Sequence, residues 1–250
     1  MSATTIAPSK PSLTTNDSAV LQALFDAESS PSSGVTINPS LPQLPAHLGI
    51  SSEEHAALQA REKDIINPLA STNQAVPEPS QIQSAVSALD ALIREHPTYP
   101  SAYANRAQAL RMLIENEDDQ KASPETISLL SSLLSDLGEA ITLATPLSPA
   151  DAVSPTQAKL LADTHTHRAY LLLKISRQLK GGDKQEVRNV PDTLKDIGSE
   201  GLEEMASRDF FLGGRYGNKV AQQMAVQTNP YAKMCGAIVK EAMRKEVEGV

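Results

Sequence analysis

The residues that could carry chemistry in this 250-residue chain are few and scattered. His165 and His167 form a close histidine pair, but positions i and i+2 of a helix face different sides, unlike the i, i+4 pair that binds metals. We therefore interpret His165 as a packing residue. The single cysteine, Cys235, has no neighbouring histidine or acid in the sequence that would activate it, so core or interface packing is its expected role.

One glycine-rich segment invites comparison with a phosphate-binding loop. It reads Gly213-Gly214-Arg215-Tyr216-Gly217, but it follows an expected helix and lacks both the Gly-Lys-Ser/Thr ending and a complete G-x-G-x-x-G pattern. A glycine-rich helix end is the better interpretation. The sequence therefore predicts no catalytic group, no metal site, no cofactor and no enzymatic activity.

Composition narrows the class of protein and partner. A formal charge of −8 disfavours nucleic acid and anionic membrane surfaces, both of which require basic patches. Aromatic residues make up only 3% of the chain, so the core must be built from Leu, Ala, Val and Ile, which pack well between helices. One cysteine, no apolar leader and no evident apolar run of membrane-spanning length predict a cytoplasmic protein, with nuclear entry left open.

Helical periodicity and cap signals predict an all-α fold. Residues 1–15 are expected to be a disordered tail, 16–27 a short amphipathic helix, 28–50 a Pro/Ser-rich linker and 51–250 a helical repeat domain. Within that domain, we expect helix pairs at about 53–97, 100–146 and 154–214, followed by capping helices over 218–248.

Spacing within these pairs fits the tetratricopeptide template of paired helices. Its clearest part follows Pro97 and reads Tyr103-Ala104-Asn105-Arg106-Ala107, with Leu110 in register. The pattern predicts a short right-handed α-solenoid of about three such pairs. An irregular helical bundle is the alternative. The residues expected to pack between helices are Ala85, Leu89, Tyr103, Ala107, Leu110, Leu137, Ala140, Ala169, Leu172, Ala206 and Phe210.

Three blocks of sequence resemble the tetratricopeptide repeat protein 36 family. They are residues 16–25, residues 101–109 and the segment Asn229-Pro230-Tyr231-Ala232-x2-Cys235, and they follow one another in order across nearly the whole chain. The resemblance implies an all-helical, non-enzymatic protein. It further implies Hsp70 binding and, more loosely, a part in the control of tyrosine metabolism.

Hsp70 tails are held by many repeat proteins in a carboxylate clamp of Lys, Arg and Asn side chains. Asn105 falls where such a clamp supplies its Asn, and Lys63 is an approximate first-repeat cation. Asp163 and His167 stand where the third repeat needs cations, which disfavours a standard clamp. Asn105 could equally be an ordinary helix-surface residue. The groove candidates are Asn105, Arg106, His167 and Lys63.

Two functions are open to a non-enzymatic protein of this kind. The favoured one is a protein-interaction module, a cytosolic co-chaperone or adaptor that binds partners in its groove. The alternative is a structural subunit or scaffold that docks through Val20, Leu21, Leu24 and Phe25, with no tail-peptide groove. A third hypothesis, a helical enzyme, has no supporting residue. The partner, the oligomeric state and the docking of the N-terminal helix are not determined by the sequence.

Overall fold

The computed structural model describes residues 35–70, 77–116, 123–181, 187–229 and 244. The chain divides into two compact units, and the unit from Thr36 to Val250 carries every element described below. The predicted tail, the amphipathic helix at 16–27 and Cys235 lie outside the described residues. So do nearly all residues after Asn229 in the predicted capping helices at 218–248.

Among the described residues, the regular secondary structure is helical, with one isolated parallel bridge between Ile37 and Val153. The α-helices are α2 (Ser52–Ile66), α3 (Pro79–Glu95), α4 (Pro100–Asn116), α5 (Pro124–Ala144), α6 (Pro155–Gly181), α8 (Asp192–Arg215) and α9 (Lys219–Thr228). Two short 3-10 turns, η1 (Ala46–Leu48) and η2 (Asn67–Leu69), flank α2. The prediction of an all-α fold is confirmed.

Local signals explain where the helices begin. Ser51 Oγ accepts a hydrogen bond of 3.1 Å from the backbone N–H of Glu54, so Ser51 caps α2. Glu78 caps α3 by forming a reciprocal capping box with Gln81. Each of α3, α4, α5 and α6 starts with a proline, whose fixed φ suits the first helical position.

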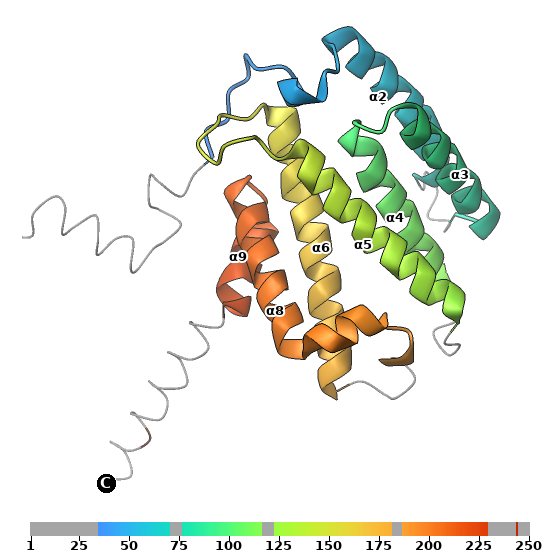
Figure 1. Ribbon diagram of the computed structural model, residues 1–250, viewed down its shortest axis with the longest axis vertical. Coiled ribbons are helices and arrows are strands. Elements are labelled where there is room, and N and C mark those ends of the chain that lie inside the picture. Colours follow the sequence, from blue (N-terminus) through green and yellow to red (C-terminus); the bar gives the residue numbers. More distant parts are fainter. Residues whose placement is uncertain (1–34, 71–76, 117–122, 182–186, 230–243, 245–250) are drawn as a thin grey trace, which may run out of the picture. The chain divides into compact units, whose positions relative to one another are not determined.

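Successive helices lie side by side, and α6 (yellow) runs between α5 and α8 (Figure 1). The side chains predicted to pack between helices are buried, except Tyr103. Most of them belong to apolar clusters between helices, the largest of which joins α6, α8 and α9 around Phe210. Burial of these aliphatic side chains supplies most of the driving force that holds the helices together.

Tyr103 differs from the sequence prediction, which expected its side chain to pack between helices. Tyr103 is half-buried, its hydroxyl donates to the carbonyl of Pro97 over 3.1 Å, and the Arg106 guanidinium lies 5.7 Å from its ring centroid. The deeply buried aromatic residue is instead Tyr99, 1% exposed, just before α4. The loop before the helix therefore supplies the ring that the template expects on the helix.

The structure also differs from the predicted linker at 28–50. Leu44 and Leu48 are buried in the cluster that contains Leu58 and Leu89. The segment is further fixed by a hydrogen bond of 2.7 Å from Ser154 Oγ to the carbonyl of Gln43. Two spaced leucines among prolines carry no helical period, so this packing could not be predicted from the local pattern.

One described helix, α5, has the length and mean hydropathy, 1.3 over its most apolar window, of a membrane-spanning helix. This differs from the expectation that the chain has no apolar run of membrane-spanning length. Core helices of soluble proteins share these properties, although only 28% of this window is buried. Here α5 packs between α4 and α6, and its buried Asp136 is bound to Arg106 of α4. We therefore describe α5 as a packing helix.

Candidate functional site

A groove of about 960 Å³ crosses the surface formed by α4, α6 and α9. Its apolar lining includes Leu137, Leu160, Leu173 and Phe210. The polar side chains that line it and matter below are Asn105, Gln108, Arg111, Asp163, His167 and Arg177. The groove therefore offers an apolar surface bordered by hydrogen-bonding and charged groups.

The structure brings together two of the four groove candidates. Asn105 of α4 and His167 of α6 line the same groove. Arg106 points elsewhere: its guanidinium donates to Asp136 over 2.7 Å and to Asp90 over 2.6 Å. These bonds raise the pKa of Arg106 further above its ordinary value. Lys63 lies on α2, outside the groove lining.

His167 is neutral at physiological pH. Burial and the nearby positive charge of Arg111 lower the pKa of His167 to about 4. Its Nε2 atom is buried and has no hydrogen-bond partner among the described residues. The side chain therefore offers the groove a neutral imidazole and not the cation that a carboxylate clamp requires.

Although His167 is neutral, the other charges along the groove favour an anionic ligand. Lys159 binds the carboxylate of Asp163 over 2.6 Å, which offsets the repulsion that Asp163 would exert on an acidic ligand. Arg177 lines the groove and forms no ion pair with any described residue. Arg111 adds a second guanidinium, with its Nε 3.4 Å from Glu115. A groove with these cations contrasts with a chain whose net charge is −8.

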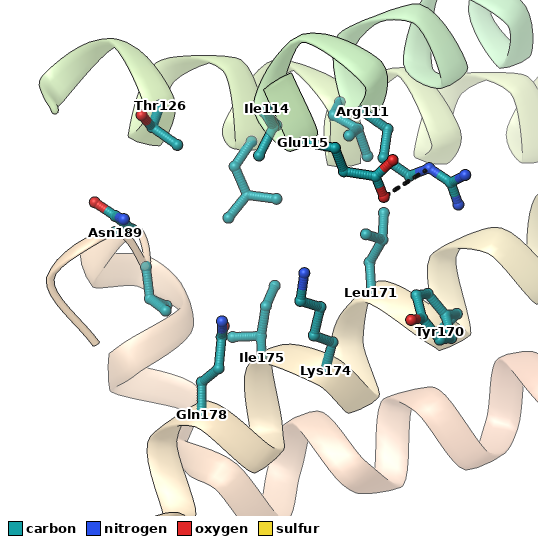
Figure 2. A pocket seen from close by; sticks show the side chains of 13 residues that line it. Arg111, Ile114, Glu115, Thr126, Tyr170, Leu171, Lys174, Ile175, Gln178 and Asn189 are labelled. Carbon is teal, nitrogen blue, oxygen red and sulfur yellow. Dashed lines mark ion pairs between the residues drawn. The ribbon is translucent and has the colours of Figure 1, made fainter. Parts of the chain in front are cut away.

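A separate cavity of about 100 Å³ lies between α4, α5, α6 and the residues Asn189 and Val190 (Figure 2). Its walls are mainly apolar. Arg111 and Tyr170 line both this cavity and the groove. The cavity was not predicted, because its lining comes from four separate parts of the sequence.

His165 lies on the opposite side of α6 from the groove, as the i, i+2 spacing predicts. Its Nδ1 is 2.8 Å from Oδ1 of Asp209 on α8, and its ring stacks on Tyr216 at 6.2 Å between centroids. A histidine–aspartate pair resembles half of an acid–base site. Both side chains are only 4% exposed, however, so no substrate reaches them and the pair joins α6 to α8.

Arg168 completes this buried network and repeats the role of Arg106. Arg168 of α6 donates to both carboxylate oxygens of Asp209, over 2.7 and 2.8 Å. Arg106 of α4 likewise binds Asp136 of α5. A fully buried alanine follows each arginine, and a buried apolar residue follows each aspartate. The second and third helix pairs therefore share one internal pattern in register.

The aspartates of these networks were missed by the sequence analysis. Asp136 and Asp209 occupy the apolar faces of α5 and α8, and a charged residue at such a position signals a buried partner. Among the residues that the structure describes, no group of three His, Cys, Asp or Glu side chains is placed to hold a metal ion.

A comparison with curated proteins finds a relative that matches the whole chain. It is 62% identical over 256 residues to a protein of Aspergillus fumigatus named L-tyrosine degradation gene cluster protein hmgX, with 100% of this chain and 99% of that protein covered. The chain belongs to the hmgX family. The proposed membership of the tetratricopeptide repeat protein 36 family is therefore wrong, because this full-length relative carries a different identity.

Hsp70 binding was implied by that resemblance alone and loses its support. No family model matches the chain, and no solved structure matches it. The geometry of the groove and cavity is therefore the main guide to what an hmgX-family protein does.

Proposed function

We propose that this chain is a non-enzymatic protein-binding module of L-tyrosine degradation that holds an acidic segment of a partner protein in the α4/α6/α9 groove. The observation that supports this best is the groove itself, a surface depression of about 960 Å³ with an apolar lining and with Arg177, which forms no ion pair with any described residue. The connection to tyrosine comes from the name of the Aspergillus fumigatus relative.

The dimensions of the groove suit a chain segment. Small-molecule pockets enclose most of their ligand within about 300–1,000 Å³, whereas this depression is open along three helices. Peptide grooves of helical proteins combine an apolar strip with polar side chains that bind the peptide backbone. Asn105 and Gln108, one turn apart on α4, are placed to exchange such hydrogen bonds.

The charges that line the groove indicate which kind of partner segment it binds. Arg177 and Arg111 attract acidic residues, and the Lys159–Asp163 pair leaves little negative charge to oppose them. Electrostatic complementarity of this kind accelerates association and excludes partners of like charge. The proposal therefore specifies an acidic, partly apolar segment.

The repeated Arg–Asp pattern supports the finer proposal of a short α-solenoid. In such an architecture, the first helices of successive pairs line one face, which is where α4 and α6 meet in the groove. The buried position of the His165–Asp209 pair supports a binding role over an acid–base role.

Genetic complementation tests the function. A strain lacking the gene for this chain is complemented with the wild-type chain, with Arg177→Glu or with Arg94→Glu, an exposed control on α3. Growth on L-tyrosine as the sole nitrogen source is measured, together with the proteins that co-purify with the chain. We expect Arg177→Glu to lose both growth and the main co-purifying protein, while Arg94→Glu retains both.

Further outcomes separate the alternatives. Full growth without the gene would remove the link to tyrosine degradation. A different result would be that the Arg177→Glu strain grows normally while deletion of residues 1–27 abolishes growth. That result would favour the alternative in which the chain docks through its N-terminal segment. A purified chain that converts a tyrosine-derived metabolite unaided would show that it is an enzyme.

A further inference from the structure

The cavity between α4, α5 and α6 has the features of a ligand site. Its apolar walls are formed by Ile114, Leu130, Leu133, Leu171, Ile175 and Val190. A well-packed helical core leaves few voids larger than a water molecule, so a cavity of about 100 Å³ is a departure that needs an explanation. The polar groups at its edge indicate what it holds.

Cations gather on one side of the cavity. Figure 2 shows the amino group of Lys174 pointing into the cavity from α6, with Arg111 and Tyr170 at the same side. Lys174 forms no ion pair with any described residue, whereas Arg111 is paired with Glu115. Positive charge beside apolar walls favours a ligand that combines a carboxylate with an apolar group.

A hydrogen-bond acceptor without a partner lies on the other side. Asn189 lines the edge of the cavity from the segment before α8 (Figure 2). Its Oδ1 atom is buried and has no hydrogen-bond partner among the described residues. Buried polar atoms are almost always paired, so a water or a ligand is expected to donate to this oxygen.

The size of the cavity limits the ligand. A cavity of about 150 Å³ is known to hold one benzene ring, and this one, at about 100 Å³, is smaller. Its volume is below that of one ring, so a ring or a short carbon skeleton would lie partly in the cavity and partly outside it.

We propose that this cavity binds a small organic acid whose carboxylate meets Lys174 and Arg111 and whose hydroxyl group donates to Asn189. The acid binds at a site distinct from the partner-binding groove, although Arg111 and Tyr170 belong to both linings. The inference stands independently of the proposed partner, because its test uses only the purified chain and small molecules.

Three probes test this chemistry by NMR titration of the purified full chain. They are 4-hydroxyphenylacetate, phenylacetate, which lacks the hydroxyl, and 4-methylphenol, which lacks the carboxylate. We expect 4-hydroxyphenylacetate to bind most tightly. Lys174→Met, at an exposed position, should weaken it about tenfold, as expected for a charged hydrogen bond, while Lys63→Met on α2 should leave its affinity unchanged.

Asn189→Leu gives a second and more specific readout. It should bring the affinities of 4-hydroxyphenylacetate and phenylacetate close together, a change that a merely structural role would not produce. The proposal would be overturned if none of the three probes bound. It would also be overturned if neither Lys174→Met nor Asn189→Leu changed the affinity for 4-hydroxyphenylacetate. Equal binding of 4-methylphenol and 4-hydroxyphenylacetate would overturn the assignment of the carboxylate.

Discussion

The hydroxyl of Tyr99 donates a hydrogen bond of 2.8 Å to Oε2 of Glu62, and both side chains are buried. Ser101 donates to the same oxygen over 2.9 Å. Burial and the carboxylate of Glu62 raise the pKa of Tyr99, so the phenol remains a donor throughout the physiological range. The contact fastens α2 to the junction between α3 and α4.

Removing that donor should destabilise the fold. Tyr99→Phe leaves the ring in place but takes one of two donors from a buried carboxylate, which we expect to cost about 1–3 kcal/mol. Urea unfolding measures the loss. Tyr103→Phe is the matched control, since its half-exposed hydroxyl binds only a backbone carbonyl and should cost less. Equal losses in the two variants would contradict the role given to Glu62.

The pair formed by Arg168 and Asp209 should be more costly to break. Arg168→Met leaves a buried carboxylate with His165 alone, and we expect a loss of about 3–5 kcal/mol at neutral pH. Arg61→Met, which removes the solvent-exposed pair with Glu95, should have a much smaller effect. Urea unfolding at pH 7 compares the two, and a similar loss in both would contradict the ranking.

The same network predicts the direction of an acid effect. Burial raises the pKa of Asp209, but hydrogen bonds from Arg168 and His165 outweigh it and hold the pKa below its usual value. This carboxylate therefore stabilises the fold above its unfolded pKa of about 3.9, and the contribution is lost as the pH falls through the lower folded pKa. The wild type should thus lose more stability between pH 5 and pH 3 than Arg168→Met.

His167 predicts a pH effect in a different range. Its pKa is about 4 in the fold and about 6.5 when unfolded, so the unfolded chain takes up the proton first as the pH falls. The wild type should lose up to about 2 kcal/mol of stability between pH 7 and pH 5 through this group. His167→Gln should remove that loss, and Asn105→Ala, at a neighbouring groove position, should retain it. Parallel pH profiles for wild type and His167→Gln would contradict the burial of this imidazole.

Helix positions could be predicted from the sequence because their signals are local. Ser51 and the prolines at positions 79, 100, 124 and 155 mark helix starts without reference to the rest of the chain. Two groove residues, Asn105 and His167, were named from the clamp positions of the tetratricopeptide template, and both line the groove. Arg106 was misplaced because its partner Asp136 lies 30 residues away, and no local signal reports such a pairing.

The packed linker offers a direct test of a feature that the sequence did not reveal. Leu44→Ala removes a buried side chain from the cluster around Leu58 and Leu89, which should cost about 2–5 kcal/mol. Leu147→Ala, at a position 83% exposed, should change stability by less than about 0.5 kcal/mol. Urea unfolding of both variants provides the measurement. A Leu44→Ala protein as stable as the wild type would restore the interpretation of residues 28–50 as a tether.

The close approach of α8 to α6 depends on Gly213. A Cβ atom at this position would lie 2.7 Å from Thr166 Oγ1 and 3.2 Å from the carbonyl of Ala162, so one of the two helices would have to shift. Thr166 Oγ1 already donates to that carbonyl over 2.6 Å and has little freedom to move. We therefore expect Gly213→Ala to cost about 1–3 kcal/mol, despite the better helix propensity of alanine.

At Gly181, the last residue of α6, we expect an alanine substitution to have the opposite effect on stability. A Cβ atom there meets nothing within 4 Å, so Gly181→Ala should be neutral or stabilising by up to about 1 kcal/mol. Thermal and urea unfolding of the two alanine variants measure the difference in sign. If Gly213→Ala were also stabilising, α6 and α8 would have room between them, and the packing around His165, Arg168 and Asp209 would be looser than described.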